Sequence, residues 1–397
     1  MKRVAMVVDD VAFPGEEGLG RMYYLAEYLC KNGLSVNLIT GKYQHWEKRY
    51  RSAEYMNQIH GQVEPTFVDE PAYRDNIDIR RLFSYRIMTS NIVSYLETQD
   101  YDLVYCEIPD NYLAYQVGCY ASSRGIPFIV DIEDLWPEAM EMIMPVKGAC
   151  KQLLYPFAVY AKKTYELADA VVGSSDTYRD EPEKYGVHID KRITVYAGAD
   201  IAAFDKGAYE HLSKIEKPKD EFWVTYAGSL GVSYDLETLI YAANLVPDIK
   251  VVILGDGPRR KELETLVNKL QAPIVFLGYQ PYALMAAYLK KSDVLVNSLN
   301  KKAHQSITTK TGDYLAAGKP MINTGADKEF SEKVDTDGFG INVEPGDIVS
   351  LANGILFLKN NPECCRIMSE KARFIAEKDF DRDKTYMNIV NLLRDFL

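Results

Sequence analysis

Short, continuous apolar runs that alternate with helical patterns constrain the fold of this chain more than any other feature of its sequence. The run at residues 4–8 precedes a helical pattern whose apolar side chains form one stripe, and a second run at 35–40 follows Gly33. Similar runs recur as far as residues 321–323. Continuous apolar runs are typical of strands that are buried on both faces of a parallel sheet. The alternation therefore predicts an α/β fold built from doubly wound sheets.

The length of the chain and a break in its pattern predict two such domains. At 397 residues the chain is too long for one ordinary core. Periodicity fades between residues 200 and 221, where lysine and glutamate dominate. We therefore expect a first Rossmann-like domain at 1–203, a linker at 204–221 and a second Rossmann-like domain at 222–380. A last helix at 384–396 has a broad apolar face that must dock, and the first domain is one candidate surface for it.

Composition and charge limit where the protein works and what it binds. The net charge of −11 argues against nucleic acid as a partner, because phosphate backbones require a basic field. The six cysteines form no CxxC pair and share no metal-ligand spacing with the five histidines, which predicts no metal site and suits a reducing compartment. The first apolar run is too short for a signal peptide, and no segment reaches the roughly 20 apolar residues of a membrane span. We therefore expect a cytoplasmic protein.

A glycine-rich loop at residues 14–20 superficially suggests a dinucleotide-binding fingerprint. Its glycines run G-x-x-G-x-G, which is the wrong order for the tight turn of that motif. Glu16 and Glu17 would also repel a pyrophosphate. The sequence therefore argues against nicotinamide or flavin binding at this loop.

The stretch at residues 304–324 carries the clearest chemical signal. It predicts a loop, a short helix with Thr308 or Thr309 as its N-cap, and a buried strand. Lys310 falls in or beside the first helical turn, where the positive end of the helix dipole disfavours a cation unless an anion is bound. Helix N–H groups, threonine hydroxyls and Lys310 therefore indicate a phosphate site, and Asp313 lies on the same face to bind a ribose. The alternative is a capped helix in which a solvated Lys310 pairs with Asp313.

Two basic and aromatic segments lie in the first half of the chain, at residues 42–51 and 80–96. Segments of this kind lie at anionic membrane surfaces or meet charged acceptors. The alternative is a solvated helix face whose apolar side packs in the core. A peripheral contact with an anionic membrane is therefore one of two interpretations of these segments.

A series of motifs in a fixed order extends over nearly the whole chain. In the second half these motifs occupy residues 228–231 (Gly-Ser-Leu-Gly), 255–260 (Gly-Asp-Gly-Pro-Arg-Arg), 278, 310–320 (Lys-Thr-Gly-Asp-Tyr-Leu-Ala-Ala-Gly-Lys-Pro), 338–343 and 345–347. In the first half they occupy residues 18–21, 134–137 (Asp-Leu-Trp-Pro) and 198–200. In this order and spacing the chain resembles the GT-B glycosyltransferases, specifically glycosyltransferase family 4, which makes bacterial surface polysaccharides.

The resemblance implies two facing Rossmann-like domains and a retaining, metal-independent transferase of the hexosyl or N-acetylhexosaminyl type. It implies that the second domain binds a nucleotide diphosphate sugar, expected to be UDP-linked, without a further cofactor. The acceptor on the first domain would be a lipid-linked molecule or a saccharide in surface polysaccharide synthesis. The implied site residues are Lys310, Gln305 and Asp134 for catalysis, Gly228, Ser229, Arg260, Tyr279, Gln280, Thr309 and Asp313 for the donor, and Gly18, Gly20 and Arg21 on the acceptor side.

The chain departs from the family pattern at three places. The family's pair of glutamates eight residues apart falls on Gln305 and Asp313. The first glycine loop lacks the arginine and lysine that many members use for the diphosphate, which leaves Arg260 and Lys310 as candidate phosphate cations. Glu133 replaces the usual arginine before the Asp-Leu-Trp-Pro motif. A nucleotide-sugar 2-epimerase and a non-catalytic sugar-nucleotide-binding protein are the alternatives, and Gln305 is the best argument for the second of these.

Overall fold

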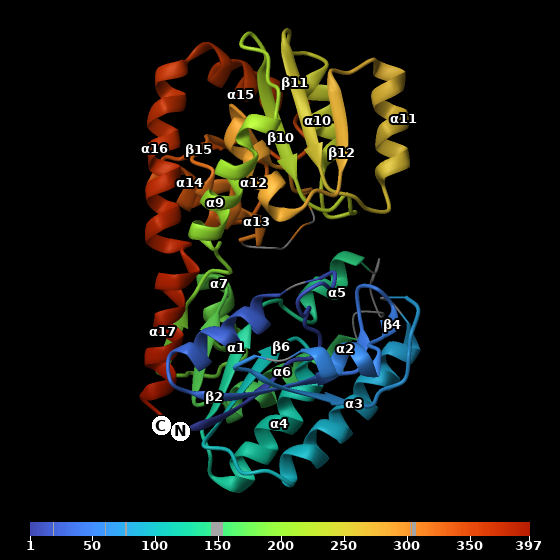
Figure 1. Cartoon of the computed structure of the whole chain (residues 1–397), viewed down its shortest axis with the longest axis vertical. Coiled ribbons are helices and arrows are strands. Elements are labelled where there is room, and N and C mark those ends of the chain that lie inside the picture. Colours follow the sequence, from blue (N-terminus) through green and yellow to red (C-terminus); the bar gives the residue numbers. More distant parts are fainter. Residues whose placement is uncertain (19, 60, 76–77, 144–153, 302, 304–306) are drawn as a thin grey trace. The chain divides into compact units, whose positions relative to one another are not determined.

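The computed structural model of the chain describes residues 1–18, 20–59, 61–75, 78–143, 154–301, 303 and 307–397. These residues form two compact units (Figure 1). Unit 1 comprises residues 1–195 together with 386–397, and unit 2 comprises residues 196–385. Each unit is an α/β structure with helices on both faces of a parallel sheet, as the alternation of apolar runs and helical patterns predicts.

Unit 1 is built on a seven-stranded sheet in the order β5-β2-β1-β6-β7-β8-β9. All neighbouring strands of this sheet are parallel. The chain moves outward in one direction from β1 to β2 and in the other from β6 to β7, so the topological switch point lies between β1 and β6. The strands are β1 (Arg3–Val7), β2 (Ser35–Gly41), β5 (Glu64–Val68), β6 (Leu103–Ile108), β7 (Phe128–Ile132), β8 (Ala170–Gly173) and β9 (Lys191–Thr194).

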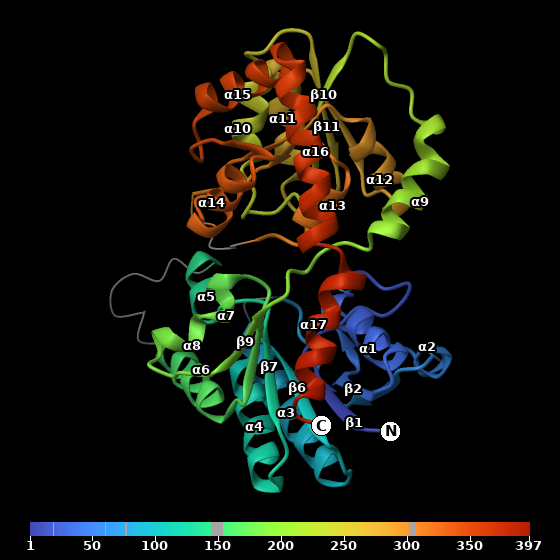
Figure 2. The same cartoon turned by 90° about the vertical axis from the view of Figure 1, so that its left-hand side faces the viewer.

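Alternate residues of the unit 1 strands point into two apolar clusters, one on each face of the sheet. Ala5 and Val7 of β1 pack with α3, α4 and α6, whereas Val4 and Met6 pack with α1 and α17 (Figure 2). The sheet is therefore buried on both sides, which explains its continuous apolar runs. The helices are α1 (Arg21–Lys31), α2 (Ala53–Gln58), α3 (Ile79–Glu97), α4 (Asn111–Arg124), α5 (Glu138–Ile143), α6 (Tyr155–Leu167), α7 (Asp176–Arg179), α8 (Glu181–Lys184) and α17 (Arg382–Arg394), and a hairpin joins β3 (Tyr43–Gln44) to β4 (Arg49–Tyr50).

Unit 2 is built on a six-stranded parallel sheet in the order β12-β11-β10-β13-β14-β15. Its switch point lies between β10 and β13, because the chain leaves these two neighbours in opposite directions. The strands are β10 (Phe222–Ala227), β11 (Ile249–Leu254), β12 (Ile274–Gly278), β13 (Val294–Asn297), β14 (Met321–Asn323) and β15 (Gly340–Asn342).

Helices also cover both faces of the unit 2 sheet. One face packs against residues of α9, α12, α13, α14 and α16, and the other against residues of α10, α11 and α15. The helices are α9 (Ile201–His211), α10 (Leu236–Ala243), α11 (Arg260–Leu270), α12 (Tyr282–Lys291), α13 (Lys310–Ala316), α14 (Lys328–Asp337), α15 (Ile348–Asn360) and α16 (Pro362–Asp379), with a 3-10 turn at Leu212–Lys214.

The stretch expected to be a linker, residues 204–221, is part of unit 2 and holds most of helix α9. Ile201, Phe204 and Ala208 are buried along one side of this helix. A Cβ at Gly207 would lie 2.7 Å from the Cα of Ala283 in α12, so the two helices pack at backbone distance. The linker prediction was therefore wrong, because abundant lysine and glutamate on the exposed side hid a short apolar stripe. The division between the units falls after Val195.

Candidate active site

Two glycine loops meet at the carboxyl ends of β10 and β11 in unit 2. Gly228 follows β10, and Gly255 follows β11 with a φ of +125°. A Cβ at Gly255 would lie 1.9 Å from the carbonyl oxygen of Gly228. The two backbones therefore approach more closely than any side chain allows, and the predicted donor residues Gly228 and Ser229 lie at the switch point of the sheet.

Lys310 is the first residue of α13, as the sequence predicts, and its ammonium lies between two tyrosine rings. Nζ is 4.4 Å from the ring centroid of Tyr226 and 4.0 Å from that of Tyr234. Within the described part of the chain this buried nitrogen has no hydrogen-bond partner. Burial alone lowers the pKa of Lys310 well below the ordinary value for lysine. The site therefore contains a desolvated amine that has no counterion among the described residues, and an anionic ligand would stabilise its protonated form.

Asp313 lies one helical turn after Lys310 but does not pair with it. Its Oδ1 accepts a hydrogen bond of 2.7 Å from the hydroxyl of Tyr282 in α12. Burial raises the pKa of Asp313 to about 6, against the opposing effects of that hydrogen bond and of Arg382. The alternative of a solvated Lys310 paired with Asp313 is wrong, since the Lys310 ammonium is buried against rings.

The N-cap of α13 falls at one of the two predicted positions but lacks a side-chain hydrogen bond. Thr309 occupies the N-cap position, but its side chain makes no capping hydrogen bond. The N–H of Thr311 instead donates to the carbonyl of Thr308 at 3.0 Å. Thr309 itself has helical φ and ψ angles, which is why its hydroxyl does not cap the helix.

Three other predicted donor residues lie around the loops that follow β11 and β12. Arg260 pairs with Asp256 at 2.7 Å and with Glu264 at 2.8 Å, so both ends of its guanidinium already face carboxylates. Gln280 donates to the carbonyl of Leu277 at 2.6 Å. Tyr279 is 80% exposed. Between the two predicted phosphate cations, Lys310 is therefore the one without a carboxylate partner. Gln305 lies outside the described residues.

The acceptor-side residues of unit 1 lie at the start of α1. Gly20 is the N-cap of this helix, and Gly18 has a φ of +124° with Trp46 where a Cβ would stand. Arg21 is only 5% exposed, and its Nη1 donates to Asp131 at 2.7 Å and also pairs with Glu133. Glu133, which stands where the family has an arginine, is thus a partner of Arg21. Through these ion pairs Arg21 connects the start of α1 to the carboxyl end of β7.

Asp134 lies just beyond the carboxyl end of β7 in unit 1. Its Oδ1 accepts a hydrogen bond of 2.9 Å from the N–H of Leu135. Burial raises the pKa of Asp134 to about 6, with a smaller contribution from Glu138. This contact joins adjacent residues and is not the N2 or N3 contact of an N-cap, so both the capping and the catalytic role of Asp134 stay predictions.

A group of carboxylates lies at the switch point of unit 1, where the α/β pattern of the sequence predicts functional loops. Asp9 follows β1, Glu107 lies near the end of β6, and Asp110 caps α4 by accepting the N–H of Tyr112 at 2.8 Å. Glu107 is 8% exposed, and its Oε2 lacks a hydrogen-bond partner in the described part of the chain. Burial, followed by the neighbouring Glu133, raises its pKa well above the ordinary value. The places of Asp9 and Glu107 at the ends of the two central strands are the signal by which the sequence identifies these loops, whereas the burial of Glu107 is seen only in the structure.

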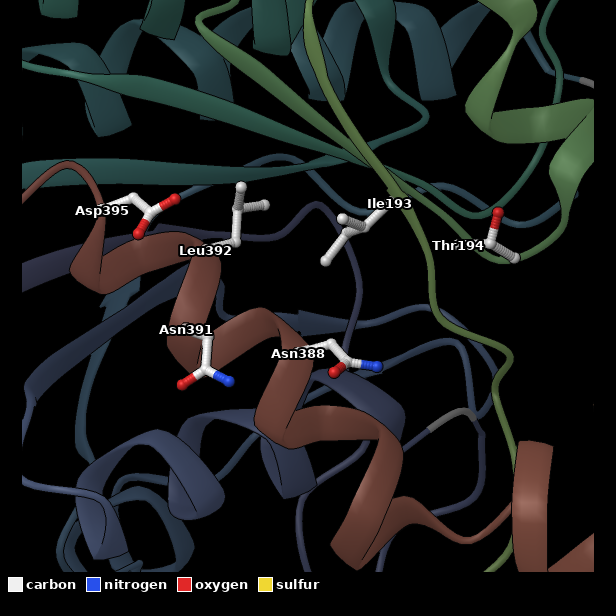
Figure 3. Close-up of a pocket in the computed structure, with 6 residues that line it drawn as sticks. All are labelled: Ile193, Thr194, Asn388, Asn391, Leu392 and Asp395. Carbon is white, nitrogen blue, oxygen red and sulfur yellow. The ribbon is translucent and has the colours of Figure 1, made fainter.

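A separate groove of about 450 Å³ lies between the edge strand β9 and helix α17 of unit 1 (Figure 3). Its lining is formed by Ile193, Thr194, Asn388, Asn391, Leu392 and Asp395. Lys191 forms an ion pair of 3.1 Å with Asp395 beside it. The groove is distinct from the predicted site residues.

Comparison with known proteins shows which family and fold the chain resembles. Residues 209–374 match the family model described as "Glycosyl transferases group 1". The fold matches that of sucrose-phosphate synthase from Thermosynechococcus elongatus over 100% of this chain and 99% of that one, with a TM-score of 0.76 and 17% identity. Residues 209–374 are therefore similar to a glycosyltransferase family, and the chain as a whole has the GT-B fold.

Two further similarities bear on the function of the protein. Over 302 residues the chain is 23% identical to "Putative colanic acid biosynthesis glycosyl transferase WcaI" of Escherichia coli (strain K12), with 72% of each protein covered. The structure of Anabaena Alr3699/HepE in complex with UDP matches with a TM-score of 0.74 and 15% identity, over 100% of both chains.

Proposed function

We propose that the protein transfers a sugar, with retention of configuration, from a UDP-linked sugar to a saccharide or lipid-linked acceptor in surface polysaccharide synthesis. The buried, unpaired amine of Lys310 at the switch point of unit 2 is the observation that carries this proposal. The similar HepE structure contains UDP, and the similar WcaI is named for colanic acid biosynthesis. Both similarities support a nucleotide donor and a polysaccharide product.

The chemistry requires a group that stabilises the departing nucleoside diphosphate. The bond between the anomeric carbon and the diphosphate oxygen breaks, and a bond from the same carbon to the acceptor oxygen forms on the same face. The acceptor proton moves to the departing phosphate oxygen, so no carboxylate nucleophile is required. Negative charge grows on the diphosphate during this step, and the Lys310 ammonium stabilises it more strongly in the transition state than in the ground state. A metal ion is not needed in this scheme.

In this proposal the other predicted residues of unit 2 bind the nucleotide-sugar donor. The Gly228–Ser229 backbone lets the diphosphate approach closely, and Asp313 accepts hydrogen bonds from the ribose hydroxyls. Tyr282 holds the Asp313 carboxylate through its hydrogen bond of 2.7 Å. Arg260 lies beyond this group and contributes less, because Asp256 and Glu264 already balance its charge.

A peripheral membrane contact through unit 1 is the second part of the proposal. At the start of α3 the side chains of Ile79 and Phe83 are 82% and 61% exposed. Arg80 and Arg86 are also exposed on this segment, and the Arg86 guanidinium lies 4.0 Å from the ring centroid of Tyr112. Exposed apolar side chains among arginines fit an anionic lipid surface that carries the acceptor. Among the described helices, none has the length and apolar character needed to span a bilayer.

Incubation with a panel of nucleotide sugars and polyprenyl-phosphate-linked or oligosaccharide acceptors tests the proposed activity. Release of free nucleotide that depends on the acceptor, with a product of retained anomeric configuration by NMR, is the expected result. An isomerised donor would identify an epimerase. Binding of donors without turnover in the presence of every acceptor would identify a non-catalytic sugar-nucleotide-binding protein.

A further inference from the structure

Tyr234 is part of the Lys310 environment but of none of the motifs that identify the family. It follows the first glycine loop, and its N–H donates to the carbonyl of Gly231 at 3.3 Å. Its ring meets that of Tyr226 edge to face, with centroids 5.9 Å apart and planes at 67°. The hydroxyl of Tyr226 donates to the carbonyl of Ser229 at 2.7 Å. Both rings are therefore fixed relative to the loop that follows β10.

The two rings replace the carboxylate that a buried lysine normally requires. A buried ammonium loses its hydration and is usually neutralised by a carboxylate. Here the contacts are the ring faces of Tyr226 and Tyr234, 4.4 and 4.0 Å from Nζ. Ring faces attract the cation through their quadrupole but carry no net charge. An anionic ligand therefore does not have to displace a protein carboxylate to reach the nitrogen.

The same geometry explains how a loop without arginine or lysine can serve a diphosphate. Residues 228–234 contain no basic side chain. The Lys310 side chain reaches this loop from α13, since a Cβ at Gly228 would lie 3.6 Å from Cδ of Lys310. The cation near the loop therefore comes from Lys310, which lies 82 positions after Gly228. The Tyr234 ring limits the space that its ammonium can occupy.

We propose that Tyr234 is a positioning residue that holds the Lys310 ammonium against the first glycine loop for the diphosphate of the donor. The inference rests on the proposed function, since it concerns the same donor site. Tyr234 acts through its ring face and without its hydroxyl. Removal of the ring frees the lysine side chain to move away, whereas removal of the hydroxyl leaves the cation in place.

Calorimetric titration of the full chain with UDP, GDP and dTDP tests this inference. For the nucleotide that binds, Tyr234→Phe should keep the dissociation constant within about threefold of the wild-type value. Tyr234→Leu and Tyr234→Met, which fill space without a ring, should weaken binding by about tenfold, a typical loss for a desolvated cation–π contact. Tyr241→Leu, at a half-exposed tyrosine of α10, is the matched control and should bind as the wild type does.

A double-mutant cycle separates positioning from a general structural effect. In a Lys310→Met background, Tyr234→Leu should cause no further loss of affinity, because the cation that it positions is absent. The pH dependence of nucleotide affinity should also change in Tyr234→Leu, since the ring environment sets the protonation of the amine, and should be retained in Tyr234→Phe. Thermal unfolding of each variant checks that the fold persists.

The outcomes distinguish the inference from the proposed function. Unchanged affinity of both Tyr234→Leu and Tyr234→Met, with weakened binding by Lys310→Met, would overturn the role of Tyr234 and leave the donor site intact. An equal loss from Tyr234→Leu with and without Lys310 would also overturn it. Failure of UDP, GDP and dTDP to bind the wild-type protein would count against the proposed function itself.

Discussion

At the scale of single residues, Lys310 is the most informative position for catalysis. If its ammonium stabilises the departing diphosphate, Lys310→Ala should lower kcat by about a hundredfold and also raise the donor KM, because removal of one charge-stabilising donor costs about 3 kcal/mol. Steady-state kinetics with the donor identified by the nucleotide-sugar panel measure both constants. Lys328→Ala, at an exposed lysine of α14, is the matched control and should retain wild-type turnover.

Lys310→Arg tests whether charge alone is sufficient. The planar guanidinium is larger than the ammonium and does not fit readily between the rings of Tyr226 and Tyr234. We therefore expect little recovery of activity relative to alanine. Unchanged kcat and KM in Lys310→Ala would remove this residue from the active site and with it the main physical reason for locating the nucleotide there.

Glu70 predicts a pH dependence of stability. It is 8% exposed, and burial raises its pKa to about 7. Because this value exceeds that of the unfolded chain, the stabilisation from the neutral carboxyl is complete below the unfolded pKa and is lost as pH rises towards and through 7. The wild type should therefore lose about 2 kcal/mol of unfolding free energy between pH 5 and pH 8 that Glu70→Gln does not lose.

Urea denaturation at the two pH values measures this difference. The glutamine amide can still accept the N–H of Tyr43 and donate to the hydroxyl of Ser84, which contact the two carboxyl oxygens of Glu70 at 3.1 Å. Glu54→Gln, at an exposed carboxylate of α2, is the control and should change stability equally at both pH values. An equal change at both values in Glu70→Gln would contradict the prediction.

The sequence correctly predicted that Lys310 lies in the first turn of a helix, but it did not indicate the rings around its side chain. A cation in the first turn of a helix is a local pattern, and helix periodicity was sufficient to detect it. Tyr226 and Tyr234 precede Lys310 by 84 and 76 positions, and only the pairing of β10 with β13 brings them together. The carboxylates at Asp9 and Glu107 are brought together by the pairing of β1 with β6 in the same way.

At the scale of secondary-structure elements, the close contact between the loops after β10 and β11 requires glycine at position 255. Gly255→Ala would put a Cβ 1.9 Å from the Gly228 carbonyl at a φ of +125°, so the loops must separate. We expect a loss of about 3 kcal/mol or more in unfolding free energy, together with weakened nucleotide binding. Differential scanning calorimetry and nucleotide titration measure the two effects.

The control for this substitution is a glycine that has a positive φ but has free space where a Cβ would stand. Gly186 has a φ of +73°, and a Cβ there meets nothing within 4 Å. Gly186→Ala should therefore cost only about 1 kcal/mol and leave nucleotide binding unchanged. Equal costs at Gly186 and Gly255 would show that the backbone angle, and not the contact between loops, sets the requirement for glycine.

The exposed start of α3 predicts binding to anionic vesicles. At low salt the protein should sediment with phosphatidylglycerol-containing vesicles, and high salt should weaken the contact, because each basic residue near the surface contributes about 1 kcal/mol. The double variant Ile79→Ser, Phe83→Ser should lose most of this binding. Phe374→Ser, at a 63% exposed phenylalanine of α16, is the control. Absence of wild-type binding at low salt would favour the solvated-face interpretation of this helix.

Sequence patterns identified the central strands better than the edges of each sheet. Central strands such as β1 and β11 are buried on both faces and consist of continuous apolar residues. The edge strands β5 and β15 are only half-buried along most of their length and include polar residues, so the apolar-run criterion missed both. Helix α9 was missed for a related reason, since only one narrow stripe of it is apolar.

At the scale of the whole molecule, the proposed mechanism predicts turnover without a divalent metal. Lys310 and backbone N–H groups stabilise the departing diphosphate in this scheme, so activity should persist in EDTA. The measurement is the rate of nucleotide release before and after exhaustive chelation. Loss of activity that magnesium or manganese restores would contradict the proposed charge stabilisation.

The division into two units was predicted from length and a fading pattern, but its position was not. The chain leaves unit 1 after Val195, whereas the sequence placed the boundary at residue 203. The boundary between two units depends on which hydrophobic core the apolar side of a short helix packs against. Helix α9 packs closely against α12 of unit 2. This contact joins residues about 75 positions apart, so the local sequence pattern does not reveal it.

The return of the chain to unit 1 at residue 386 has a consequence for biosynthesis. Tyr386, Ile389, Val390 and Leu393 complete the apolar cluster that covers one face of the unit 1 sheet. Ribosomes make these residues only after all of unit 2 has been synthesised, so during the intervening 190 residues this face of the nascent sheet has α1 but lacks α17. Unit 2 can therefore finish folding before unit 1 is complete, although its synthesis starts later.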